Sequence, residues 1–132
     1  MKQAKRIAVL IILTAGPFFI LGCLWYLRFS INARAPARLA INEAQGAASV
    51  QRMIGEPLHS SRFIRGILLS KDGYGNADLT IPVSGSHGHG TLFEWAQEDK
   101  GKWHICSLIL RPTDAVIATE IVSDTATHCE RE

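Results

Sequence analysis

Two histidines that could bind a metal lie in a glycine-rich stretch, residues 85–90, with the sequence GSHGHG. Its histidines, His87 and His89, stand two residues apart, and three further histidines of the chain could join them in space. Imidazole nitrogens bind copper and zinc, but a metal site also needs a fixed third ligand and supporting hydrogen bonds. The sequence therefore favours a glycine turn with solvated histidines, and a metal site is the alternative.

Other chemistries find less support in the sequence. A phosphate-binding glycine loop lies between a strand and a helix N-terminus, whereas a strand pattern follows residue 90. No serine stands in the Gly-x-Ser-x-Gly pattern of an activated nucleophile. Asp78 and Glu94 are predicted on the solvated faces of neighbouring strands, as surface charges rather than an acid–base pair. No catalytic residue is therefore predicted.

The three cysteines, Cys23, Cys106 and Cys129, do not have the spacing of a metal site. Cys106 falls in the middle of a predicted strand, where a structural role is expected rather than that of a nucleophile. In an oxidising compartment Cys106 and Cys129 could form a disulfide. The sequence does not fix the distance between them, so free thiols are the alternative.

The charge of the chain is unevenly distributed. The formal net charge is +2, but four of the 14 basic residues precede residue 30, whereas all 12 acidic residues follow it. The part beyond residue 29 therefore has a net charge of −2. Binding to phosphates needs a concentrated positive face, so nucleic acid is not expected as a partner.

Residues 7–27 form an uncharged, apolar run, IAVLIILTAGPFFILGCLWYL. As a helix this run reaches about 30 Å, which is the thickness of the hydrocarbon core of a bilayer. The sequence predicts a basic tail over residues 1–6 and a single-pass transmembrane signal anchor over residues 7–29. Because the short tail is the easier end to hold inside, we expect the C-terminal domain outside the cytoplasm, in a bacterial periplasm or an equivalent space.

Two alternatives remain for this segment. Residues 20–23, ILGC, resemble the lipobox of bacterial lipoproteins, in which Cys23 would be lipidated. The next residues, LWYL, are still apolar, which is unusual for a mature lipoprotein. A cleaved secretory signal would have a shorter apolar region followed by a small-residue cleavage site.

The remaining chain predicts an α+β fold. After a joint at residues 30–36, a helix with an alanine-rich apolar stripe runs from Pro36 to about Met53 or Ile54. It is packed on a four-stranded antiparallel meander within residues 37–112, and residues 113–132 form a loosely ordered tail with a short edge strand at 119–122. The predicted strands cover residues 63–70, 77–84, 91–97 and 103–110. The glycines expected at turns are Gly55, Gly73, Gly75, Gly85, Gly88, Gly90 and Gly101.

An ordered series of short motifs resembles the cytochrome c oxidase complex assembly protein one family. The matching segments are IGEPL at 54–58, Gly66, GNADL at 75–79, IPVSG at 81–85, GHGTL at 88–92 and GKW at 101–103. The resemblance covers about residues 37–110. It implies a domain similar to that of the mitochondrial import-translocase subunit Tim twenty-one.

The same resemblance implies a non-enzymatic role in the assembly of a membrane complex, without a bound cofactor. The expected partners are subunits of such a complex, for example a respiratory oxidase. The pair His87 and His89 departs from the family pattern, and the tail beyond Pro112 does not match it. A periplasmic metal-handling protein that uses His87 and His89 is therefore the alternative function.

Overall fold

A computed structural model describes residues 2–122 and Cys129 of the chain. The chain divides into two compact units, residues 1–32 and residues 33–132. The boundary falls inside the predicted joint at residues 30–36. That joint is helical apart from Ala33, which separates the first two helices.

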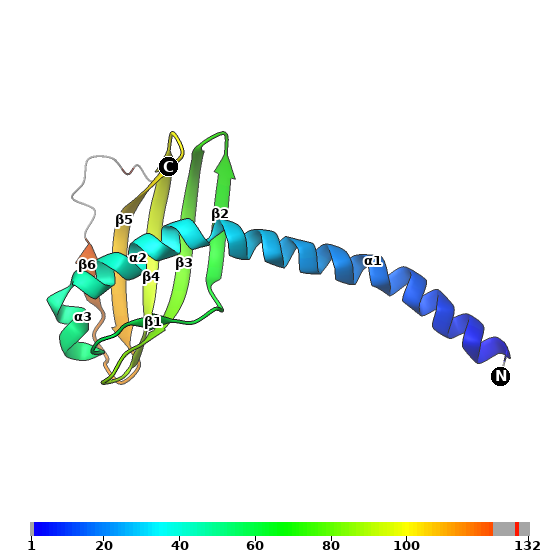
Figure 1. The fold of residues 1–132 in the computed structure, drawn as a ribbon, viewed down its shortest axis with the longest axis horizontal. Coiled ribbons are helices and arrows are strands. Elements are labelled where there is room, and N and C mark those ends of the chain that lie inside the picture. Colours follow the sequence, from blue (N-terminus) through cyan, green and yellow to red (C-terminus); the bar gives the residue numbers. More distant parts are fainter. Residues whose placement is uncertain (1, 123–128, 130–132) are drawn as a thin grey trace. The chain divides into compact units, whose positions relative to one another are not determined.

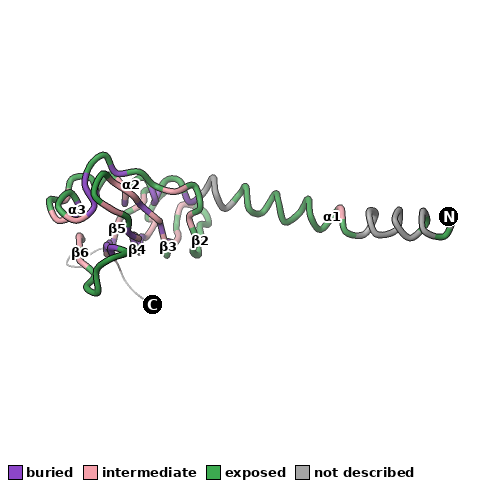
Figure 2. Tube along the Cα trace, turned by 90° about the horizontal axis from the view of Figure 1, so that it is seen from below, coloured by how far each residue is buried: buried purple, intermediate pink, exposed green. Residues whose placement is uncertain are grey.

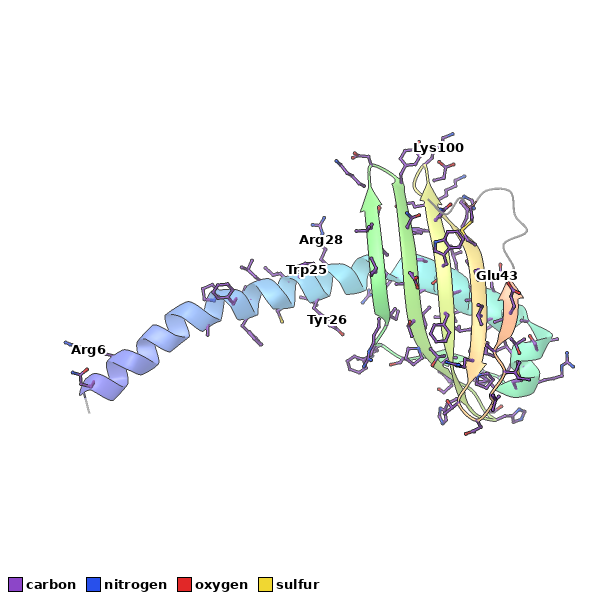
Figure 3. All side chains as sticks on the ribbon, turned by 180° about the vertical axis from the view of Figure 1, so that it is seen from behind. Arg6, Trp25, Tyr26, Arg28, Glu43 and Lys100 are labelled. Atoms are coloured by element: carbon purple, nitrogen blue, oxygen red, sulfur yellow. A yellow bond between two sulfur atoms is a disulfide. The ribbon has the colours of Figure 1, made fainter. Side chains whose placement is uncertain are left out.

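The first unit is a single helix, α1 (Lys2–Asn32), which includes Pro17. Arg6 lies near its first end, whereas Trp25, Tyr26 and Arg28 lie towards its other end (Figure 3). Within the described part of the chain, no helix was found that is both long and apolar enough to cross a membrane. The transmembrane anchor at residues 7–29 therefore stays a prediction.

The second unit begins with two helices, α2 (Arg34–Gly46) and α3 (Ala48–Met53), where the sequence predicted one. The prediction of a continuous helix is wrong at Ala47, which has an extended backbone with φ −83° and ψ 120°. Ala47 accepts hydrogen bonds from the N–H groups of Val50 and Gln51, so it starts a new helix. The change of direction follows Gly46, a weak helix former.

Side-chain hydrogen bonds stabilise this break. The Gln51 side chain donates to the carbonyl oxygen of Gln45 over 3.0 Å, which satisfies a carbonyl group at the end of α2. The Gln45 side chain donates in turn to the carbonyl oxygen of Leu58 over 3.3 Å. These two bonds depend on side chains that come together only in the folded chain, so helical periodicity alone does not reveal them.

In the described part of the chain the sheet has six antiparallel strands, two more than the predicted meander. Its order is β1–β3–β4–β5–β6, and β2 also pairs with β3 (Figure 1). The predicted edge strand at residues 119–122 is present as β6, and β1 adds a two-residue strand that was not predicted. The strands are β1 (His59–Ser60), β2 (Arg65–Lys71), β3 (Tyr74–Ser84), β4 (His89–Asp99), β5 (Lys102–Pro112) and β6 (Thr119–Val122).

Two tight hairpin turns join the long strands. Asp72 and Gly73 connect β2 to β3 with φ values of 55° and 81°, and Lys100 and Gly101 connect β4 to β5 with φ values of 51° and 78°. Positive φ at both central residues is the geometry of a type I′ turn, which matches the twist of the flanking strands. The N–H of Gly101 also donates to the carbonyl oxygen of Gly73 over 2.8 Å, which ties the two turns together.

Pro82 explains why β1 and β2 are separate strands on the same side of β3. β2 pairs with β3 as far as Thr80, and β1 pairs with Val83 and Ser84. Pro82 has no N–H to donate and lies in the interval between these pairings, although its carbonyl oxygen accepts from the N–H of Ser61 over 2.8 Å. The proline thus keeps the carbonyl half of the pairing at this position and lacks the N–H half.

The core of the domain lies between α2 and one face of the sheet. α2 crosses β3, β4 and β5 on this face (Figure 1), and Figure 2 shows buried segments on the helix and on the strands beneath it. Apart from Pro36, the buried residues from Ala33 to the end of α2 are alanines, which lets this helix approach the sheet closely. These alanines are Ala33, Ala37, Ala40 and Ala44. The α+β prediction is therefore confirmed.

The tail is described only in part. Residues 113–122 include β6, which pairs with the end of β5. The Thr119 hydroxyl lies 3.7 Å from the Met53 sulfur, so this strand also contacts α3. Beyond residue 122 the structure describes only Cys129. The prediction of a loosely ordered tail therefore concerns residues outside the described part of the chain.

Candidate functional site

The glycine-rich turn between β3 and β4 packs against the end of the helix layer. The N–H of His87 donates to the carbonyl oxygen of Ile54 over 2.7 Å, and the N–H of Gly85 donates to that of Gly88 over 2.9 Å. The first bond satisfies a carbonyl group at the C-terminal end of α3. The turn therefore joins the helix layer to the sheet.

Close packing accounts for the glycines of this turn. A side chain on Gly85 would overlap the carbonyl oxygens of Ile54 and Gly55. On Gly90 a Cβ would lie 2.8 Å from Cδ1 of Ile54, whereas on Gly88 the nearest atom would be 3.9 Å away. The interpretation that these glycines supply positive φ is wrong, because positive φ occurs in this region only at Gly55, outside the turn.

The other predicted turn glycines divide into two kinds. Gly55, Gly73 and Gly101 have φ values of 85°, 81° and 78°, and they lie at the end of α3 and in the two hairpin turns. Gly75 lies within β3 rather than in a turn. A side chain there would overlap the carbonyl oxygen of Leu69, so Gly75 allows β2 to approach.

The candidate metal ligands are placed by different parts of the structure. His87 lies in the turn, close to Gly55, whereas His89 is an exposed residue at the start of β4. Among the described residues, no group of three or more His, Cys, Asp or Glu side chains is arranged to hold a metal ion. His128, a further candidate, lies outside those residues. The geometry around His87 and His89 thus offers no argument for the metal-handling alternative.

The structure joins Cys106 to Cys129 by a disulfide, with 5.8 Å between their Cα atoms. Cys106 is buried in β5, next to a register shift between β4 and β5. The bond attaches the end of the chain to an inner strand of the sheet. Cys23 is a free, exposed cysteine in α1.

Loss of this disulfide should destabilise the domain. The bond closes a loop with a sequence separation of 23, so a Cys129→Ser variant should lose about 3 kcal/mol of unfolding free energy. Urea denaturation of the oxidised protein measures this difference, and Cys23→Ser is the control that should leave the curve unchanged. Identical curves for the Cys129→Ser variant and the parent would contradict a structural disulfide.

The residue that sequence reasoning misplaced is Glu94, in the middle of β4. Its side chain is 1% exposed, and neither carboxyl oxygen has a hydrogen-bond partner among the residues that the structure describes. The prediction that Glu94 lies on a solvated face is wrong. The inward face of β4 consists of Leu92, Glu94 and Ala96, whereas Phe93 and Trp95 point to the other face.

The surroundings of Glu94 are apolar. Its cross-strand neighbours are Leu79 in β3 and Leu108 in β5. Because water is excluded, burial raises the pKa of the Glu94 carboxyl from 4.5 to about 7. Asp78 is exposed on the opposite face of the sheet, so the two carboxylates do not form an acid–base pair.

The face of the sheet away from α2 and the β2 edge expose several apolar side chains. Ile67 and Leu69 of β2 are each 67% exposed, and Phe93 of β4 is 38% exposed. Ile67 lies opposite Asp78, which in turn lies opposite Trp95, so the carboxylate of β3 separates the apolar side chains of β2 from the aromatic side chains of β4. Apolar side chains that gather on one surface are typical of protein–protein contact.

Comparison with known protein families identifies one match. The model for cytochrome oxidase complex assembly protein 1 matches residues 9–119, which include most of α1 and nearly the whole α+β domain. Comparison with curated proteins and with solved structures gave no match. Since the match covers far more than half of the chain, this protein belongs to the cytochrome oxidase complex assembly protein 1 family.

Proposed function

We propose that this chain is a non-enzymatic assembly factor for cytochrome oxidase, which acts by binding another membrane protein. The observation that carries the proposal is the family match over residues 9–119. The apolar side chains on the β2 edge and on the face of the sheet that α2 does not cover support it, because they offer a surface for a partner. The buried Glu94 is not a candidate for catalysis, since its carboxyl group is closed off from solvent.

The proposal includes a membrane anchor formed by α1. Residues 7–27 carry no charge, Lys2, Lys5 and Arg6 precede them, and Trp25 and Tyr26 stand near their end. Basic and aromatic residues of this kind prefer the two boundaries of a bilayer. In this proposal the N-terminus stays in the cytoplasm and residues 33–132 lie outside it, where an oxidising environment would favour the disulfide.

Affinity purification tests the assembly function. Full-length tagged protein, extracted from its native membrane in mild detergent, should enrich cytochrome oxidase subunits or other assembly factors. A tagged chain reduced to residues 1–36 keeps the proposed anchor and should enrich none of them. Absence of oxidase subunits and assembly factors from the full-length sample, with the protein folded and exported, would contradict the proposed function.

Extraction and protease protection test the anchor. The full-length chain should stay in the membrane fraction after an alkaline carbonate wash, and protease added to spheroplasts should digest the C-terminal domain. A Cys23→Ser variant should behave identically. If this variant were released from the membrane instead, lipidation at Cys23 would replace the transmembrane anchor.

A further inference from the structure

The outer edge of β2 is open. β2 pairs with β3 along its whole length, and no described strand pairs with its other side. In an antiparallel sheet, alternate residues of an edge strand direct their N–H and C=O groups away from the sheet. β2 contains no proline and no inward-pointing charge that would block a further strand. The edge is therefore competent to accept another extended segment.

Apolar side chains accompany this open edge. Ile67 and Leu69 are each 67% exposed, and Phe63, just before the strand, is 69% exposed. Ile67 and Leu69 are two residues apart, so they point to the same face, the one that α2 does not cover. A strand added at this edge would cover both side chains and remove their apolar surface from water.

Basic residues frame the apolar pair. Arg65 and Lys71 are exposed at the two ends of β2 and share the face of Ile67 and Leu69 by the same alternation. Residues 62–71 contain three basic residues and no acidic one, although the chain beyond residue 29 has a net charge of −2. β2 is thus a positively charged strip at the edge of a weakly negative domain, and the exposed Asp78 of β3 lies on the inner side of this strip, opposite Ile67.

We propose that β2 binds an extended segment of a partner protein as an additional strand, with acidic residues of that segment facing Arg65 and Lys71. This inference rests on the proposed function and names the surface that recognises the partner. Main-chain hydrogen bonds would supply affinity. Specificity would come from the alternate side chains of the partner segment, in the order acidic, apolar, apolar, acidic, which match the side chains of β2 on the same face.

Charge argues against a second copy of this chain as the occupant. Antiparallel pairing of two β2 strands about Leu68 places Arg65 of one copy opposite Lys71 of the other. Parallel pairing in register places Arg65 beside Arg65. Like charges directly opposite each other destabilise a strand pair, so self-association at this edge is disfavoured.

The open backbone argues against a lipid surface as the occupant. A basic and apolar strip also attracts anionic membranes, but lipid cannot pair with a row of N–H and C=O groups. An extended peptide satisfies both the backbone groups and the side chains. The backbone groups and the side chains of β2 together therefore favour an extended protein segment as the ligand.

Peptide binding to the full-length protein in detergent tests the proposal. The probe is a short fluorescent peptide of alternating valine and threonine with glutamate at both ends, and a second peptide carries lysine there instead. Fluorescence anisotropy should give about tenfold or greater preference for the glutamate-ended peptide. Hydrogen exchange should show new protection at residues 65–71 on binding.

Charge reversal makes the test specific. In an Arg65→Glu/Lys71→Glu variant the preference should reverse, so that the lysine-ended peptide binds more tightly. The matched control, Arg38→Glu/Arg52→Glu, changes the net charge equally at exposed helical positions and should keep the original preference. Both variants alter exposed side chains, and unchanged thermal melting would establish that they fold.

Several outcomes would overturn the proposal. These are an absence of saturable binding to either peptide, a preference that survives the reversal, or protection that appears away from β2. Binding only to phosphatidylglycerol vesicles would show that the strip contacts a membrane instead. Dimerisation that is weakened by Ile67→Lys would show that the strip binds a second copy of this chain.

The proposed function can fail separately from this inference. If an Ile67→Lys/Leu69→Lys variant still purifies with oxidase subunits, β2 is not the recognition edge and the assembly role stands. The control for this variant is Ile117→Lys, which adds a charge at another exposed apolar position. If the unaltered protein enriches no oxidase subunit or assembly factor, the assembly role itself fails.

Discussion

Replacement of Glu94 by leucine should stabilise the domain, and the gain should increase as the pH rises. The carboxyl group lies between Leu79 and Leu108, and no described residue forms a hydrogen bond with either of its oxygens. Leucine has a similar size and needs no partner, so it removes the cost of burying the carboxyl group. The free energy of unfolding, measured by urea denaturation with tryptophan fluorescence, reports the gain.

The pH dependence follows from the raised pKa of Glu94. The folded protein keeps this proton up to about pH 7, whereas the unfolded chain releases it at about pH 4.5. Between these values the folded state binds more protons, so the stability of the parent falls as the pH rises. The stabilisation that the bound proton gives the folded state is complete below pH 4.5. It falls as the pH rises and is lost at pH 7 and above, which lowers the free energy of unfolding by about 3 kcal/mol.

Among the described residues, no other charged group faces Glu94 and changes the sign of this effect. The inward residues of β3 and β5 are apolar, and the charged residues of α2, Arg34, Arg38 and Glu43, are exposed. Glu94→Gln is the control, because it keeps the size and polarity of the side chain but cannot ionise. Equal pH dependence in the parent and in Glu94→Gln would contradict an isolated buried carboxyl group.

The sequence predicted the hairpin turns and the inward side of β3 correctly, because short segments of the chain determine these features. Asp72–Gly73 and Lys100–Gly101 need positive φ for a tight hairpin, and aspartate–glycine is a strong signal for such a turn. The alternation in β3 also identified its inward side correctly, because Leu79 and Ile81 are buried. These features depend on residues close together in the sequence.

Other parts depend on contacts that the sequence does not reveal. In β4 both faces carry large residues, with Leu92 on the inward face and Phe93 and Trp95 on the other, so residue size alone does not identify the buried face. The pairing of Glu94 with Leu79 and Leu108 puts it on the face that α2 covers. The break at Ala47 similarly depends on Gln51 reaching the end of α2, which helical periodicity cannot predict.

The glycine-rich turn illustrates the same limit at the candidate site. The sequence predicted a turn at residues 85–90, and residues 85–88 do connect β3 to β4, but the sequence did not identify the neighbour that requires glycine. That neighbour is the end of α3, whose carbonyl groups at Ile54 and Gly55 lie against the turn. The contact joins segments some thirty residues apart, so it becomes visible only once the two layers are assembled.

Substitution of Gly85 by alanine should therefore be strongly destabilising. The added methyl group would overlap two carbonyl oxygens of the main chain, which cannot rotate away as a flexible side chain would. Either the turn or the end of α3 must move, which would weaken the hydrogen bond between His87 and Ile54. We expect a loss of about 3 kcal/mol in the free energy of unfolding.

Gly88→Ala is the matched control in the same turn. A Cβ at Gly88 would have its nearest contact 3.9 Å away, at the carbonyl oxygen of Met53, and its φ is not in the positive region. Its effect should stay below about 1 kcal/mol. Urea denaturation of both variants distinguishes the two explanations of these glycines. If only backbone freedom mattered, the two substitutions would have similar effects. A large loss confined to Gly85→Ala would instead locate the requirement in the contact between the turn and the helix layer.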